Sequence, residues 1–191
     1  MGWAKYLMTF IGQYQSQDHQ LSLDIIQWFE SSQHQPGSFL IEGQSRVDLS
    51  VKSCDQCHLD TNTDLWLRYQ QFLQLAADAY IVDYPWSNSF GSWAVREPIL
   101  IQRYLPGQAY HAYHCERPDN SWPAHARHLV FMTYLNTVSD QGGTEFPQQN
   151  LIITPQQSMT VIWPADWTHV HRGIASSTQI KYIATGWFQY L

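Results

Sequence analysis

Two histidines and one carboxylate, distant in the sequence, could together hold a metal ion. His114 and Glu116 belong to the tripeptide His-Cys-Glu, and His171 lies near the C-terminus. Side chains two apart in an extended strand project to the same face, so His114 and Glu116 can point inward together. Two imidazoles and one carboxylate on one face of a metal leave three coordination positions open for other ligands. We therefore predict a metal centre that also binds a reactant.

The ligand types favour Fe(II). Neutral imidazole and carboxylate form a borderline-to-hard set, and this set with open positions is typical of non-haem Fe(II) oxygenases. The absence of paired thiolates beside it disfavours a structural zinc site, although the residues alone leave zinc, manganese and nickel open. They also leave open whether His169 or His171 is the distal ligand, because the two lie two residues apart.

The elements that must position these residues indicate a mainly β fold with N-terminal helices. Apolar residues at helical spacing predict helices over residues 21–29 and 65–81. Short β-type segments, punctuated by Pro and Gly, follow in the second half of the chain. These segments cover residues 99–104, 110–116, 129–135, 151–154, 159–163 and 179–191. Several short strands at near-regular spacing predict a double-stranded β-helix, that is, a jelly roll (DSBH).

A chain of 191 residues fits a single domain around one core. We expect residues 1–96 to provide helical support and a loop, and residues 97–191 to form the DSBH catalytic core. Residues 35–64 are polar and turn-rich, which predicts irregular structure. Residues 83–93 read as a loop capable of covering a pocket.

Composition excludes several classes of function. The formal net charge is −6 with no run of Lys or Arg, which argues against a nucleic-acid partner. The apolar runs are too short for a membrane span, and residues 1–11 lack a long apolar stretch with a cleavage site. Three cysteines do not resemble the disulfide framework of a secreted protein. We expect a cytoplasmic protein, and the oligomeric state is left open.

Further motifs accompany the candidate ligands between residues 104 and 187. They are Tyr104-Leu105-Pro106-Gly107, Tyr134-Leu135-Asn136, Gly142-Gly143-Thr144-Glu145-Phe146-Pro147 and Trp187. With these motifs the chain resembles the prolyl 4-hydroxylase-like branch of the 2-oxoglutarate- and Fe(II)-dependent dioxygenases. It departs from that branch in two places: Thr144 stands one position early in its turn, and Glu116 replaces the usual aspartate, which is one methylene shorter.

The resemblance implies Fe(II) held by His114, Glu116 and His171, with 2-oxoglutarate and O2 as cosubstrates and ascorbate as an optional reductant. It favours His171 over His169, because relatives place a basic residue about ten positions after the distal ligand and Lys181 stands at that spacing from His171. Lys181 would then pair with the far carboxylate of 2-oxoglutarate. A cation in an otherwise uncharged, apolar C-terminal segment needs such an anionic partner.

The resemblance also implies that Tyr104 and Tyr134 form hydrogen bonds to the cosubstrate. The alternative for both tyrosines is a structural role, as aromatic side chains packed in the core. The implied reaction hydroxylates an unactivated C–H bond while 2-oxoglutarate is decarboxylated to succinate. The substrate would be a prolyl peptide or an amino acid. Substrate contacts are expected from residues 83–93 and 117–126.

Other interpretations compete with this one. A jelly-roll protein of the cupin type could bind metal or ligand without oxygenase chemistry, although such a protein would have no need of Lys181. A dioxygenase could also act on a small metabolite. Cys54, Cys57 and His58 match the C-x-x-C-H motif of haem attachment, and the two thiols could instead form a redox or metal-binding pair; an ordinary loop is favoured over both.

Overall fold

The computed structural model describes residues 9–191. The expectation that residues 1–11 form no cleavable apolar segment concerns mainly residues outside this range. Its two α-helices are α1 (His19–Ser31) and α2 (Asp64–Asp83). Both predicted helices are confirmed, and each is longer than the apolar pattern indicated. The earlier starts, by two residues in α1 and one in α2, have a local cause: the Asp18 side chain accepts a hydrogen bond from the Leu21 amide, and the Thr63 side chain accepts one from the Trp66 amide. Within residues 9–191, neither helix has the length and apolar character needed to cross a membrane.

The largest element is an eight-stranded antiparallel sheet. Its path runs β1 (Gly12–Gln15), β11 (Met159–Pro164), β8 (Arg127–Tyr134), β13 (Lys181–Tyr190), β7 (Leu100–Tyr104), β5 (Asp55–His58) and β2 (Gln35–Pro36), and β6 (Trp93–Val95) pairs with β13 off this path. A second sheet contains β10 (Leu151–Ile153), β9 (Thr144–Phe146) and β12 (Arg172–Gly173), and β3 (Phe39–Ile41) forms a hairpin with β4 (Gln44–Arg46). Single turns of 3-10 helix cover Pro85–Asn88, Ala124–Ala126, Pro147–Gln149 and Trp167–His169.

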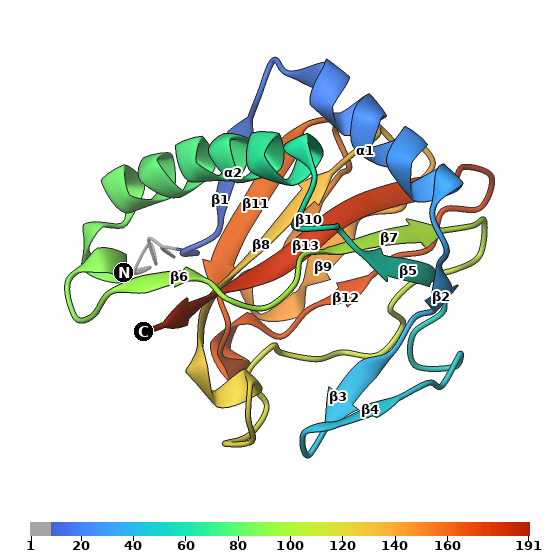
Figure 1. The fold of residues 1–191 in the computed structure, drawn as a ribbon. Coiled ribbons are helices and arrows are strands. Elements are labelled where there is room, and N and C mark those ends of the chain that lie inside the picture. Colours follow the sequence, from blue (N-terminus) through green and yellow to red (C-terminus); the bar gives the residue numbers. More distant parts are fainter. Residues whose placement is uncertain (1–8) are drawn as a thin grey trace, which may run out of the picture.

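The large sheet has two buried faces. Figure 1 shows α1 and α2 lying across one face, with the smaller sheet on the other. Side chains of β8 alternate between these faces: Leu129 and Phe131 join the core beneath the helices, whereas Val130 and Met132 join the core between the sheets. Two antiparallel sheets packed in this way, with helices outside, confirm the predicted jelly-roll architecture.

Two local expectations are wrong. Residues 110–116 do not form a strand, because their partners change: Tyr110 makes an isolated bridge with Lys52, and His114 makes one with His171. No continuous ladder forms along that segment. Residues 35–64 are not irregular throughout, since they contain β2 to β5, and β5 extends the main sheet beside β7. The N-terminal half therefore contributes strands as well as helical support, and the boundary at residue 96 stays a prediction.

We expect the docking of α1 to depend on its inward face. Ile25 is 0% exposed within the core beneath the helices, whereas Leu23 on the same helix is 49% exposed. Replacing Ile25 with Ala should lower the free energy of unfolding by about 2–5 kcal/mol, because it removes buried methyl groups and leaves a cavity. The matched control, Leu23→Ala, should change it by about 0.5 kcal/mol or less. Urea denaturation measures both, and equal effects would contradict the described orientation of α1.

Candidate metal centre

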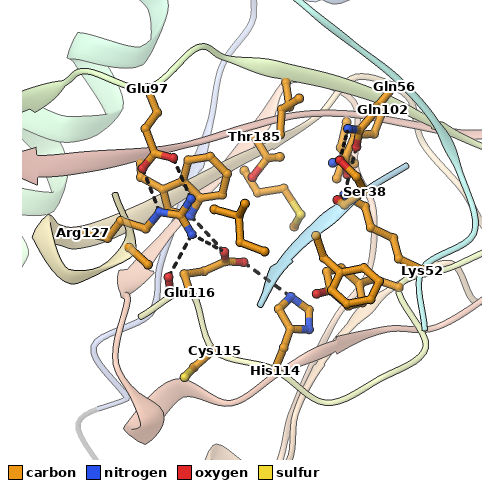
Figure 2. Close-up of a pocket in the computed structure, with 18 of the residues that line it drawn as sticks. Ser38, Lys52, Gln56, Glu97, Gln102, His114, Cys115, Glu116, Arg127 and Thr185 are labelled. Atoms are coloured by element: carbon orange, nitrogen blue, oxygen red, sulfur yellow. Dashed lines mark hydrogen bonds and ion pairs between the residues drawn. The ribbon is translucent and has the colours of Figure 1, made fainter. Parts of the chain in front are cut away.

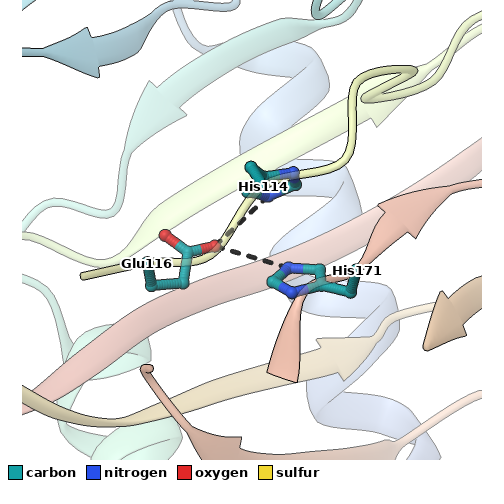
Figure 3. Close-up of side chains that lie close together, drawn as sticks. All are labelled: His114, Glu116 and His171. Carbon is teal, nitrogen blue, oxygen red and sulfur yellow. Dashed lines mark ion pairs between the residues drawn. The ribbon is translucent and has the colours of Figure 1, made fainter. Parts of the chain in front are cut away.

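His114, Glu116 and His171 converge although they come from separate segments. Their candidate ligand atoms all lie within 4.8 Å of one another. Glu116 Oε1 is 3.4 Å from His114 Nε2 and 3.5 Å from His171 Nε2 (Figure 3). The backbones of the two histidines are joined by reciprocal hydrogen bonds, from the His114 amide to the His171 carbonyl at 3.0 Å and back at 2.9 Å. This isolated bridge, rather than a regular strand, brings the three side chains together.

The orientation of each imidazole is set by a backbone carbonyl. His114 Nδ1 lies 3.0 Å from the Ala112 carbonyl, and His171 Nδ1 lies 3.0 Å from the His169 carbonyl. A carbonyl only accepts, so each Nδ1 carries the proton and, in the neutral ring, each Nε2 presents a lone pair. Burial and the neighbouring His171 lower the pKa of His114, which favours the neutral ring.

The carboxylate between them is ionised. Burial raises the pKa of Glu116, but hydrogen bonds and positive charge from His114 and His171, when these rings are protonated, outweigh burial and hold that pKa well below its usual range. When both rings are neutral, one carboxylate oxygen and two imidazole lone pairs face one another instead. Electron pairs and an anion in this arrangement require a shared cation, so the residues present fit a divalent metal such as Fe(II).

A second set of contacts orients Glu116. Its Oε2 accepts a hydrogen bond from Trp187 Nε1 at 3.0 Å, which leaves Oε1 directed at the histidines. Arg127 lies 3.5 Å from the same Oε2 and donates to the Glu116 backbone carbonyl at 2.9 Å. Glu97 binds the Arg127 guanidinium through two hydrogen bonds of 2.8 and 2.6 Å (Figure 2). The guanidinium also stacks 3.6 Å from the Trp187 ring centre. Arg127 therefore fixes the position of Glu116 both directly and through Trp187.

The three residues line a cavity of about 370 Å³, and Lys181 and Tyr104 also line it. Lys181 is 5% exposed, and its Nζ donates to the Gly142 carbonyl at 2.8 Å and lies 4.7 Å from the Tyr104 ring centre. Burial lowers its pKa to about 8. Within residues 9–191, no carboxylate lies within 4.0 Å of Lys181 Nζ. The cavity thus contains an ammonium group that lacks a counterion from this part of the chain.

The remaining predicted residues fall into two groups. Tyr104 lines the cavity, and its hydroxyl donates to Gln102 Oε1 at 2.7 Å. Tyr134 is fully buried and does not line the cavity; its hydroxyl lies 2.7 Å from the Thr144 hydroxyl, and Thr144 is in the wall. The hydroxyl of Tyr134 thus reaches the cavity wall only through Thr144, and its implied contact with a cosubstrate stays a prediction. His169 turns away from the centre, with Nε2 2.9 Å from the Thr9 carbonyl.

The mouth of the cavity differs from expectation in part. Residues 83–93 do not line it, so the predicted substrate contacts from that loop are wrong. The 117–126 segment does contribute, through residues that include Pro118 and Asp119. The β3–β4 hairpin forms another wall, with Phe39 and Leu40. The hairpin was missed because its strands are only three residues long and stand in a polar segment.

The C-x-x-C-H motif lies in and next to strand β5. Cys54 and Cys57 are free thiols in and next to β5, and burial raises the pKa of both, in Cys57 to about 11. Such thiols are poor metal ligands and poor nucleophiles. The sequence analysis missed two other residues of this region, Lys52 and Gln56, which line the cavity. The only signal was a lone Lys before a short alternating strand.

Comparisons with known proteins agree with this geometry. Residues 99–189 match the family model of the 2OG-Fe(II) oxygenase superfamily. A search of curated proteins finds no match.

Among solved structures, the chain is similar to the viral collagen prolyl hydroxylase of Paramecium Bursaria Chlorella virus-1 in complex with 2OG. The identity is 16% and the TM-score 0.68, with 95% of this chain and 97% of that chain covered. It is also similar to a Pseudomonas putida prolyl-4-hydroxylase, with 13% identity, a TM-score of 0.70, and coverage of 95% and 92%. A Trichoplax adhaerens prolyl hydroxylase in complex with a hypoxia inducible factor peptide fragment shares 15% identity at a TM-score of 0.71, with coverage of 96% and 84%.

At these identities the structural matches establish the fold alone, and the family assignment comes from the matched segment, which contains all three converging residues. Residues 99–189 of this chain belong to the 2OG-Fe(II) oxygenase superfamily.

Proposed function

We propose that the protein is an Fe(II)- and 2-oxoglutarate-dependent dioxygenase that hydroxylates an unactivated C–H bond of a prolyl peptide or an amino acid. His114, Glu116 and His171 are the proposed iron ligands. The observation that carries the proposal is the shared cavity: a three-residue metal centre opens onto the same space as a buried ammonium group without a counterion among residues 9–191. A dicarboxylate that chelates a metal and extends a second carboxylate complements both features.

The bound groups supply the oxidation. Fe(II), with 2-oxoglutarate and O2, provides the oxidant for the C–H bond, and 2-oxoglutarate becomes succinate and CO2. The chain positions these groups. Lys181 would hold the far carboxylate of 2-oxoglutarate, and the Tyr104 ring beside it limits where the ammonium can lie. Apolar side chains in the cavity wall, including Met132 and Ile183, exclude water around the reacting atoms.

The prolyl substrate is supported by the resemblance of the fold to proteins named as prolyl hydroxylases, one of them in complex with a peptide fragment. A cupin-type protein that only binds metal is the weaker alternative, because burying Lys181 beside the metal centre costs free energy unless an anion is bound there. The proposal is tested by anaerobic loading with Fe(II) and 2-oxoglutarate, followed by O2. Succinate should form, with or without a peptide or amino-acid substrate, and its absence from metal-replete protein would exclude oxygenase activity.

The two C-terminal histidines should differ sharply in their contribution. Replacing His171 with Ala removes a proposed iron ligand and should abolish succinate formation and weaken Fe(II) binding. The matched control, His169→Ala, should retain much of the activity, because His169 bonds the Thr9 carbonyl and lies outside the converging set. Metal content and succinate yield measure both variants. The opposite ranking would reverse the assignment of the distal ligand.

The indole of Trp187 should tune metal affinity without touching the metal. Trp187→Phe keeps an aromatic ring beside Arg127 but removes the N–H that holds Glu116 Oε2. Losing a partner that orients a ligand typically weakens metal binding by about 10- to 100-fold. Calorimetric titration with Mn(II) measures the change, and an unaltered affinity would show that Glu116 is oriented by Arg127 alone.

Binding of 2-oxoglutarate should depend on pH through Lys181. The pKa of this lysine in the free protein is about 8, and a bound carboxylate raises it by favouring the ammonium form. The dissociation constant should therefore be flat below pH 8 and rise above it, approaching about tenfold per pH unit. Lys181→Arg should remove this rise because guanidinium stays charged, and Lys181→Met should give weak binding throughout. A wild-type constant that is flat up to pH 10 would argue against this role for Lys181.

A further inference from the structure

A second buried lysine lines the same cavity. Lys52 precedes β5 and is 4% exposed. Its Nζ donates to the Ser38 carbonyl at 2.8 Å and to Gln56 Oε1 at 3.0 Å. Both acceptors are neutral, and within residues 9–191 no carboxylate lies within 4.0 Å of this ammonium group. An ammonium group has three N–H donors, so one donor remains after these two bonds.

Lys52 lies close to the proposed iron ligands. Its Nζ is 5.5 Å from the centre of the Tyr110 ring, and that ring stacks on the His114 imidazole at 3.6 Å with an angle of 11°. The backbone bridge between Lys52 and Tyr110 fixes this order. Burial lowers the pKa of Lys52, and the nearby Cys54 and Glu116 oppose this shift only in part. One aromatic ring therefore separates the ammonium group from the metal centre, and Figure 2 shows Lys52 and His114 facing the same pocket.

The charges of the cavity leave Lys52 without a counterion even when the cosubstrate is bound. A divalent metal, the Glu116 carboxylate and the Lys181 ammonium group together carry two positive charges. The two carboxylates of 2-oxoglutarate neutralise these two charges, one at the metal and the other at Lys181. Arg127 is neutralised separately by Glu97. Glu42 and Asp119 also line the cavity, but both are exposed and neither carboxylate lies within 4.0 Å of Lys52 Nζ. Lys52 is therefore the buried cation of this cavity that still lacks an adjacent anion, and a buried unpaired charge favours binding of one.

We propose that Lys52 is a specificity-determining residue that binds a carboxylate of the substrate, so the preferred substrates carry a carboxylate near the C–H bond to be hydroxylated. This inference rests on the proposed function and narrows it. Ser38 and Gln56 hold the ammonium group in place, and its remaining N–H binds the substrate. The carboxylate can belong to a free amino acid or to an acidic residue of a peptide, and these sources share the same chemistry at Lys52.

The test uses full-length protein loaded with Mn(II) and saturating 2-oxoglutarate without O2, so that the Lys181 site is filled and no turnover occurs. Calorimetry then compares matched probes: L-proline with L-prolinamide, and the blocked tripeptide Ala-Pro-Glu with Ala-Pro-Gln. Acetate serves as the smallest carboxylate. We expect at least one carboxylate probe to bind the wild type about 10- to 100-fold more tightly than its neutral partner. The pair that is discriminated identifies the source of the carboxylate.

Lys52→Met should remove this discrimination while leaving 2-oxoglutarate affinity near its wild-type value, and its melting temperature should fall because the Ser38 carbonyl and Gln56 lose a buried donor. Lys52→Arg should restore part of the discrimination. Arg46→Met, which removes an exposed cation from β4, controls for net charge and should leave the discrimination intact. A role confined to linking β5 to Ser38 would lower the melting temperature of Lys52→Met but leave the preference for carboxylate unchanged.

Three results would overturn the role of Lys52: no discrimination of any pair by the wild type, discrimination that persists in Lys52→Met, or weaker 2-oxoglutarate binding in Lys52→Met. Persistence would mean that the probe carboxylate binds the metal. Failure of the proposed function would give a different result, because the metal-loaded wild type would then not bind 2-oxoglutarate at all.

Discussion

The site depends on two hydrogen bonds in which backbone carbonyls accept the Nδ1 protons of His114 and His171. These bonds fix which nitrogen of each ring is free, and the reciprocal backbone pairing of the same two residues fixes where those nitrogens lie. Glu116 places a carboxylate next to the lone pairs of two neutral imidazoles. These three groups repel one another unless they share a cation. Metal affinity is thus a consequence of backbone geometry, which explains why two ligands from distant segments can be held without a regular strand beneath either.

Strand β13 connects the metal centre to the buried ammonium group of Lys181. Its residues Lys181, Ile183, Thr185 and Trp187 alternate along the strand, and all four line the cavity. One end therefore supplies the ammonium group and the other supplies the indole that holds Glu116. Pairing of Lys181 with Tyr104 in β7 sets the far wall. Because a shift of register by one residue would turn this whole set away, the pairing of β13 with β7 and β8 determines both the charge and the shape of the site.

The sequence predicted the parts of the site that are encoded by local spacing. The two-residue interval from His114 to Glu116 selected that pair, and the family resemblance selected His171 and Lys181; the structure brings all four to one cavity. The long helices were predictable for the same reason, since their periodicity extends over several turns. The sequence could not show which segments pair with one another: residues 110–116 resemble a strand, but Tyr110 pairs with Lys52 and His114 pairs with His171. Lys52 itself was missed because its burial depends on β5, whose four residues are too few to show a pattern.

The contacts of Lys52 link recognition to the hairpin at the cavity mouth. The Ser38 carbonyl that accepts its hydrogen bond immediately precedes β3, and Phe39 and Leu40 of that strand form part of the wall. A two-stranded hairpin has little stability of its own and relies on such attachments. An anion bound at Lys52 keeps the ammonium group charged, which strengthens its bond to the Ser38 carbonyl and so stabilises the base of the hairpin. Substrate charge and the order of the cavity mouth are therefore coupled through a single side chain.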